Sequence, residues 1–180
     1  ERGQEDFDLV CPSEYIIERM LKKDLLLPIN RNFGKTPDYI PNISPYIQKE
    51  LEKISQPGRH TNDYVVPYMW GTAGILYNKK FKTLEEVSSW GCLWDAVNRG
   101  KILMKDSYRD AYGTAIIYAH ARQLADSTIT VEQLMNDNSP EAIALAEQYL
   151  KDLKPNIAGW EADFGKEMMT KNKAWLNLTW

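Results

Sequence analysis

The alternation of short extended segments with helical segments constrains the fold of this 180-residue chain more than any other feature. The clearest helical segment runs from Pro140 to Leu153, where apolar residues recur with helical spacing. Strands and helices alternate from residue 101 to the end, and this order predicts an α/β fold with largely parallel sheets. The predicted helices are 14–22, a short helix from Pro45, 90–98, 109–125, 140–153 and 165–171, and the predicted strands are 8–11, 101–105, 156–160 and 174–180.

Proline and glycine interrupt the first part of the chain. Residues 30–44, which include Pro37 and Pro41, are predicted to form a loop. Residues 64–77 are predicted to be extended, but Pro67 and two glycines disfavour a regular central strand. This composition suits a segment that bends, or one that crosses between two lobes.

Composition excludes several classes of protein. Hydrophobic residues make up 43% and charged residues 26%, as in an ordinary globular protein. The net charge is -3 and no long run of one sign occurs, so nothing indicates the basic face that nucleic acid requires. No apolar stretch is long enough to span a membrane. The charged start, residues 1–6, is not a signal peptide, so we expect any export signal to lie outside this chain. Cys11, at the end of the first predicted strand, and Cys92 are expected to be free thiols.

No common catalytic signature occurs in the sequence: a phosphate loop, a nucleophile elbow and a His-Glu-x-x-His motif are all absent. His60 lies in a predicted loop and His120 in the middle of a predicted helix, and lone histidines of this kind are usually surface or packing residues. We therefore expect no metal and no cofactor. An enzyme that uses Asp106 and Asp110 as an acid/base pair is a weaker alternative, because no third group orients a base. A turnover assay separates it from a receptor.

Residues 104–110 carry the most informative local pattern, because they leave a predicted strand and begin a predicted helix. Ligands of α/β proteins bind just outside the carboxyl ends of strands. On one interpretation, which is the commoner use of such residues, Asp106 or Ser107 caps the helix and Asp110 stabilises its positive end. On the other, Asp110 offers a carboxylate to a ligand ammonium group through a charge-assisted hydrogen bond.

Residues 11–15 repeat this arrangement of strand end, short turn and helix start. Ser13 and Tyr15 either cap and pack the helix or face a cleft. Trp180 ends a predicted strand and Trp70 lies in the bent segment, so each is a core residue or a candidate ligand-binding residue.

Five segments in chain order resemble the spermidine/putrescine-binding proteins of polyamine ABC transporters. Residues 8–15 resemble the D-hydrophobic-V-x-P-S-x-Y segment of that family, and residues 66–75 resemble its crossover strand. Residues 94–110 resemble its LW…G-x-hydrophobic-D-D/S-x-R-D/E segment, and residues 153–157 and 176–180 follow in the family's order. The resemblance covers nearly the whole chain, and five motifs in order make it specific.

The resemblance implies a periplasmic-binding-protein-like fold: two α/β lobes with parallel-rich sheets, joined by crossing strands, with the ligand clamped between them. Residues 1–68 would be part of the first lobe, residues 69–77 a crossover or hinge, and residues 78–180 most of the second lobe. It also implies a non-catalytic receptor that captures spermidine or putrescine for the permease subunits of an ABC importer. Such a receptor is periplasmic or extracellular, and is attached to the membrane as a lipoprotein or a permease fusion.

The site residues follow from the same resemblance, position by position. Ser13 and Tyr15 would line the cleft from the first lobe. Asp110 would bind an amino group from the second lobe, and Trp180 would form an aromatic wall. Ser107 stands where some members carry a second acid, which leaves the exact polyamine open.

The resemblance further implies an internal fragment, because the family has an earlier strand and a later return to the first lobe. We therefore expect an incomplete first lobe and only part of the pocket. The isolated chain is expected to bind polyamine poorly and to self-associate through unfilled sheet edges. A receptor for another small cationic or organic solute, and a sensor domain that reuses the fold, stay open as alternatives.

Overall fold

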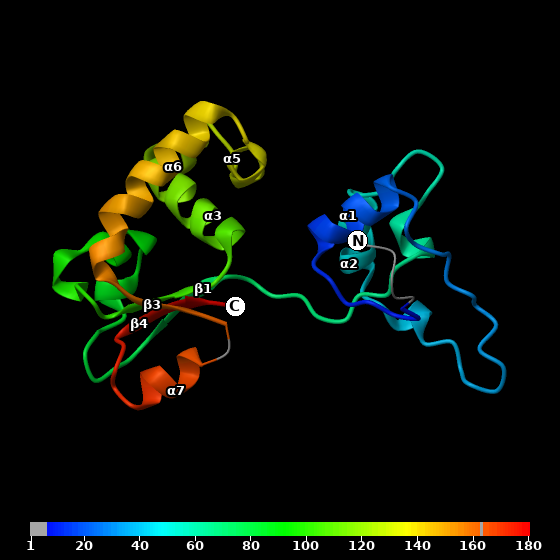
Figure 1. Cartoon of the computed structure of the whole chain (residues 1–180), viewed down its shortest axis with the longest axis horizontal. Helices are drawn as coiled ribbons and strands as arrows, with labels where there is room; N and C mark the ends of the chain where they lie inside the picture. The colour runs from blue at the N-terminus through cyan, green and yellow to red at the C-terminus, as the bar shows by residue number, and fades with distance from the viewer. Residues whose placement is uncertain (1–6, 163) are drawn as a thin grey trace. The chain divides into compact units, whose positions relative to one another are not determined.

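The structure, a computed structural model, describes residues 7–162 and 164–180. The chain divides into two compact units, the first ending at Trp70 and the second running from Gly71 to Trp180 (Figure 1). The predicted lobe boundaries, and the assignment of residues 69–77 to a crossover segment, stay predictions.

The first unit contains two α-helices, α1 (Glu14–Lys22) and α2 (Pro45–Glu52), as the sequence predicts. Short 3-10 turns, η1 (Ile40–Asn42) and η2 (Thr61–Asp63), interrupt the remaining loops. Polar contacts between distant segments hold the unit together. Arg59 donates a hydrogen bond to the main-chain oxygen of Leu21 at 2.9 Å and forms an ion pair with Asp24 at 2.7 Å.

The predicted strand at residues 8–11 is wrong, because the structure has no strand there. Leu9 is 87% exposed, and Cys11 is exposed as well. A strand is stable only when a neighbour satisfies its backbone groups, and within the described part of the first unit no strand is available. The apolar pattern in residues 8–11 therefore fails to predict pairing.

The second unit contains a four-stranded mixed sheet in the order β1-β4-β2-β3. Strand β2 (Ile102–Lys105) pairs in parallel with both β3 (Ile157–Glu161) and β4 (Leu176–Thr179). Strand β1 (Gly74–Tyr77) pairs antiparallel with β4. The prediction of an α/β fold with largely parallel strands is therefore confirmed, with an antiparallel strand at one edge.

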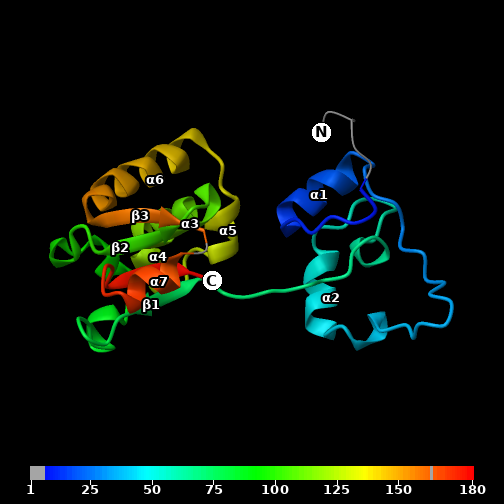
Figure 2. The ribbon, with the colours of Figure 1, turned by 60° about the horizontal axis from the view of Figure 1, so that its bottom comes forward.

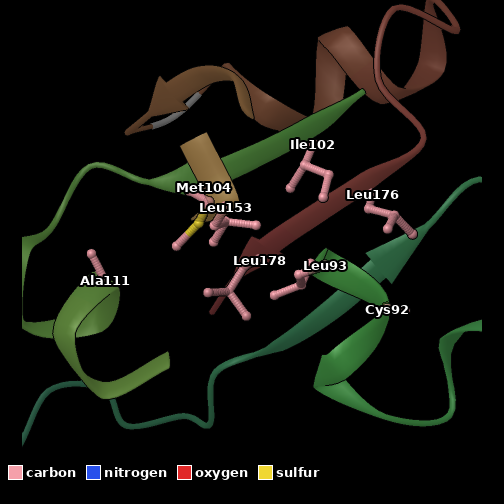
Figure 3. Packing of buried hydrophobic residues seen from close by; sticks show 8 residues of the cluster. All are labelled: Cys92, Leu93, Ile102, Met104, Ala111, Leu153, Leu176 and Leu178. Carbon is pink, nitrogen blue, oxygen red and sulfur yellow. The ribbon is translucent and has the colours of Figure 1, made fainter. Parts of the chain in front are cut away.

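Helices cover both faces of this sheet. In Figures 1 and 2, α3 (Tyr108–Ala119) and α6 (Pro140–Leu153) lie over one face and α7 (Gly165–Thr170) over the other. Figure 3 shows the core on the first face, where Ile102, Met104, Leu176 and Leu178 of the strands meet Ala111 of α3 and Leu153 of α6. On the opposite face, Leu103 packs with Met169 of α7 and with Ala174.

The prediction of one regular helix at residues 90–98 is wrong. Over these residues the chain instead forms two 3-10 turns, η4 (Trp90–Trp94) and η5 (Ala96–Asn98), which follow an earlier turn, η3 (Glu85–Val87). Two buried amide side chains hold these turns, Asn98 from within η5 and Asn156 from a distant segment. Asn98 donates to the main-chain oxygen of Cys92 at 2.8 Å, and Asn156 donates to those of Leu93 at 2.8 Å and Asp95 at 3.0 Å. These bonds engage carbonyl groups that a regular helix would use itself.

The predicted helix 109–125 is broken at His120, which separates α3 from α4 (Ala121–Ala125). His120 therefore lies at a helix end, and not in the middle of a helix, and its Nδ1 is 2.9 Å from the main-chain oxygen of Ile116. A further helix, α5 (Val131–Asn136), was not predicted. The remaining short turn is η6 (Lys154–Asn156), just before β3.

Within residues 7–162 and 164–180, none of the helices combines the length and the apolar character needed to cross a membrane. Both cysteines are free thiols, as predicted, and Cys92 is buried among the core residues. Burial raises the pKa of the Cys92 thiol, and the nearby charge of Asp95 adds to this effect.

Candidate functional site

The carboxyl ends of β2, β3 and β4 lie at one edge of the sheet, because the three strands are parallel. Met104 of β2 is paired with Leu178 of β4, so the chain leaves both strands at the same level. The predicted segment 104–110 and Trp180 therefore leave neighbouring strands at this carboxyl edge, where α/β proteins bind ligands.

Ser107 begins α3 at this edge. It is the N-cap residue, and its Oγ accepts a hydrogen bond from the main-chain N–H of Asp110 at 3.3 Å. The capping interpretation is therefore confirmed for Ser107, whereas Asp106 is exposed and does not occupy the cap position. A hydroxyl that accepts this bond still has its own proton to donate, so capping leaves Ser107 able to contact a ligand.

Asp110 lies in the first turn of α3 and is half-buried. Its main-chain groups are engaged: the N–H by Ser107, and the oxygen by the hydroxyl of Thr114 at 2.7 Å. Its carboxylate accepts no hydrogen bond and forms no ion pair with any other residue that the structure describes. The start of α3, at the carboxyl edge, therefore carries a carboxylate whose main chain is held and whose oxygens no described residue engages.

Trp180 follows β4 and is 69% exposed, so it is not a core residue. The ammonium group of Lys105, the last residue of β2, lies 4.6 Å from the centroid of the Trp180 ring. Reasoning from the sequence missed Lys105. The position of Lys105 at a strand end, just before residues 106–110, indicates a place near the site. Nothing in the sequence indicates its contact with Trp180, which lies far along the chain.

A buried carboxylate connects the end of β3 to β4 and to the start of α7. Glu161 of β3 is 2% exposed and accepts a hydrogen bond from the main-chain N–H of Gly165 at 3.0 Å. The side-chain amide of Asn177, in β4, donates to the other oxygen of Glu161 at 3.4 Å. These bonds tie the start of α7 to β3 and β4, so Glu161 supports the edge and does not face a ligand.

The first unit carries the other predicted site residues. Ser13 is the N-cap residue of α1 and is exposed, but its side chain makes no capping hydrogen bond. The interpretation that its hydroxyl caps the helix is therefore wrong. Tyr15 lies in the first turn of α1 and is half-buried. Trp70 is 69% exposed, and its ring centroid is 6.0 Å from that of Tyr46. Ser13 and Tyr15 therefore share one helix start, and Trp70 is an exposed aromatic residue.

Each histidine contacts a group nearby in the chain, His60 a side chain of α2 and His120 the main chain of α3. The ring of His60 is exposed, with Nδ1 3.2 Å from a carboxylate oxygen of Glu52. A hydrogen bond from the Ser55 hydroxyl, assisted by those from His60 and Asn62, lowers the pKa of Glu52. In the part of the chain that the structure describes, no group of three or more His, Cys, Asp or Glu side chains is placed to hold a metal ion.

Comparison with known proteins agrees with this fold. The profile of a family described as "Bacterial extracellular solute-binding protein" matches residues 2–180. The spermidine/putrescine-binding periplasmic protein of Escherichia coli K12 is 28% identical over 174 residues, which cover 97% of this chain and 44% of that protein. The chain therefore spans less than half the length of this relative.

Two solved structures share the fold. The spermidine/putrescine ABC transporter substrate-binding protein PotD from Streptococcus pneumoniae is 28% identical, with a TM-score of 0.63, and the match covers 93% of this chain and 45% of that one. A putative spermidine/putrescine ABC transporter protein from Listeria monocytogenes is 23% identical, with a TM-score of 0.66 and the same coverage of 93% and 45%. The second likeness concerns the fold alone.

Proposed function

The chain belongs to the bacterial extracellular solute-binding protein family, and we propose that it captures a polyamine, spermidine or putrescine, for an ABC importer. The names of the relatives support the class of ligand. The observation that carries the proposal is the Asp110 carboxylate at the carboxyl edge, which no described residue engages, with the exposed Trp180 ring at the same edge.

This pair of groups matches the chemistry of a polyamine. A flexible polycation needs carboxylates at its ammonium groups, because a charge-assisted hydrogen bond is stronger than a neutral one. It also needs aromatic faces for its ammonium groups and apolar surface for its methylenes. Asp110 supplies the first kind of group and Trp180 the second.

The proposal gives each predicted site residue a role. In the second unit, Asp110 binds a ligand ammonium, Ser107 donates or accepts a hydrogen bond beside it, and Trp180 forms an aromatic wall. In the first unit, Ser13 offers a hydroxyl that α1 does not use, and Tyr15 and Trp70 offer aromatic rings. Ser107 in place of a second acid reduces the negative charge that meets the ligand.

We also propose the setting of the receptor. It is non-catalytic, uses no cofactor, and delivers its ligand to the permease subunits of an ABC importer. It acts in the periplasm or outside the cell, attached to the membrane as a lipoprotein or a permease fusion. The periplasmic location in the name of the Escherichia coli relative supports this setting.

Titration calorimetry on the full-length protein tests the proposed ligand. We expect spermidine or putrescine to bind, and Asp110→Asn to lower the affinity about 10- to 150-fold, the equivalent of about 1.5–3 kcal/mol for one charge-assisted contact. Asp152→Asn is the matched control, because Asp152 is an exposed residue near the end of α6, away from the carboxyl edge. It should bind as the parent does.

Two results would overturn the proposal. One is the absence of binding of either polyamine to the full-length parent, together with binding of another small solute. The other is turnover of the ligand, which would indicate an enzyme. Equal affinity of Asp110→Asn and parent would remove Asp110 from the site.

A further inference from the structure

Lys105 leaves the sheet on the face covered by α7. Ile102 and Met104 of the same strand pack into the cluster under α3 and α6, whereas Leu103 packs with Met169 of α7. Successive side chains of a strand point to opposite faces, so Lys105 shares the face of Leu103. The carboxyl end of β2 therefore places a long cationic side chain beside the site.

Two groups hold the Lys105 ammonium at the carboxyl edge. Its Nζ lies 4.6 Å from the centroid of the Trp180 ring, well within the distance of about 6 Å at which a cation and an aromatic face attract each other. The same ammonium donates a hydrogen bond to the main-chain oxygen of Ala162, just after β3. Lys105 thus connects the two segments that leave β3 and β4, its neighbouring strands in the sheet.

We infer that Lys105 is a specificity-determining residue: its ammonium occupies the face of Trp180 that would otherwise take a ligand ammonium, and so weakens polyamine binding. The inference rests on the proposed function, because it requires a polyamine at Trp180. Two like charges a few ångströms apart repel each other, so they do not share one ring face. A bound polyamine either displaces Lys105 or lays its methylenes against the ring.

The number of ligand charges decides how strong this effect is. Spermidine carries three ammonium groups and putrescine two, so spermidine places more positive charge near Lys105. The fixed ammonium at Trp180 is therefore expected to act against spermidine more than against putrescine. Ser107, the N-cap residue of α3, is uncharged and so does not offset this repulsion.

Calorimetry on the full-length protein with Lys105→Met tests the inference. The substitution keeps an unbranched apolar stem and removes the charge. We expect spermidine affinity to rise about two- to fivefold, the range of an exposed cation–π contact, with a smaller rise for putrescine. Lys105→Arg keeps both the charge and the ring contact and should bind as the parent does. Lys105→Gln serves as a second neutral variant in case Lys105→Met folds poorly.

Lys101→Met is the matched control. Lys101 precedes β2, and its ammonium lies 5.6 Å from the centroid of the Trp175 ring. The control therefore loses the same charge and the same kind of contact at the other end of the strand. Its polyamine affinity should equal that of the parent. An equal rise in Lys101→Met and Lys105→Met would show an effect of net charge alone and overturn the inference.

Failure of the inference and failure of the proposed function give different results. If the parent binds neither polyamine, the proposed function fails. If the parent binds and neither neutral Lys105 variant changes the affinity or the preference between spermidine and putrescine, the function stands and the inference is overturned. In a Trp180→Leu background, Lys105→Met should raise affinity less, because the contested ring is gone. An equal rise there would also contradict the inference.

Discussion

The two units of the chain are stabilised in different ways. Among the described residues of the first unit, only Leu21 and Thr61 are buried. The second unit has three clusters of buried apolar residues, built on both faces of its sheet. The comparison teaches that apolar packing stabilises the second unit, whereas turns and polar contacts provide most of the stabilising interactions of the first.

The first unit also leaves large apolar side chains exposed to solvent. Leu9 is 87% exposed, Leu27 is 89% exposed, and Tyr68 and Met69 are each 79% exposed. Apolar side chains of this size in solvent favour association with another surface. We therefore retain the proposal that the isolated 180-residue chain self-associates. We expect the first unit to contribute more of the associating surface than the second.

The largest expected effect is the loss of a core side chain from the second unit. Leu178 is 1% exposed and belongs to the cluster shown in Figure 3, so Leu178→Ala should lower the free energy of unfolding by about 2–5 kcal/mol. The matched change in the first unit, Leu27→Ala, should alter it by less than about 0.5 kcal/mol. Urea unfolding followed by tryptophan fluorescence gives both values. Equal losses would break the comparison.

Substitutions at two glycines, one in each unit, are expected to have intermediate effects on stability. A Cβ at Gly165 would meet the Glu161 carboxyl carbon at 2.8 Å and the Asn177 amide as well, so Gly165→Ala should cost about 1–3 kcal/mol of stability through overpacking. Gly58, in the first unit, has open space around it but a φ of +72°. Gly58→Ala should therefore cost about 1–2 kcal/mol through backbone strain.

Asparagine distinguishes these two causes. It tolerates the left-handed backbone, so Gly58→Asn should recover much of the loss caused by Gly58→Ala. It is larger than alanine, so Gly165→Asn should be less stable than Gly165→Ala. The opposite order at either position, measured by the same unfolding experiment, would refute the assigned cause.

The smallest effect concerns the helix caps. The Oγ of Ser139 accepts a hydrogen bond from the N–H of Ala142 at 3.2 Å at the start of α6, so Ser139→Ala should destabilise the second unit by about 1 kcal/mol. Ser13 makes no capping hydrogen bond at the start of α1. Ser13→Ala should therefore leave stability unchanged within about 0.5 kcal/mol, yet weaken polyamine binding by the full-length protein. A stability loss without a change in affinity would identify Ser13 as a structural residue.

Local patterns predicted much of the fold. The helical spacing of apolar residues and the proline at its start gave the exact bounds of α6, Pro140–Leu153. The same approach missed α5, although its capping box, formed by Thr130 and Gln133, is visible in the sequence. The capping box is thus a local signal that indicates the start of this helix.

Long-range contacts account for the other errors. The turns at residues 90–98 depend on Asn156, whose amide reaches carbonyl groups about sixty positions earlier in the chain, as its contacts with Leu93 and Asp95 show. The predicted strand at residues 8–11 needed a partner that the described first unit does not supply. No periodicity in the sequence reports such pairings.

Local sequence patterns likewise predicted one part of the candidate site, whereas long-range contacts determine the other part. The strand-to-helix turn indicated Ser107 and Asp110, because ligand residues favour that position in α/β proteins. The parallel pairing of β2 with β4, which brings Trp180 to the same edge, requires the structure. The contact between Lys105 and Trp180 joins the ends of two strands, and only the folded chain reveals it.

A crystal structure of the full-length protein with bound spermidine tests the central claim most directly. The account predicts a ligand ammonium within about 3 Å of the Asp110 carboxylate, as in other charge-assisted hydrogen bonds, and ligand methylenes or an ammonium against the Trp180 ring. Spermidine bound elsewhere, with the Asp110 carboxylate and the Trp180 ring both left in solvent, would contradict it.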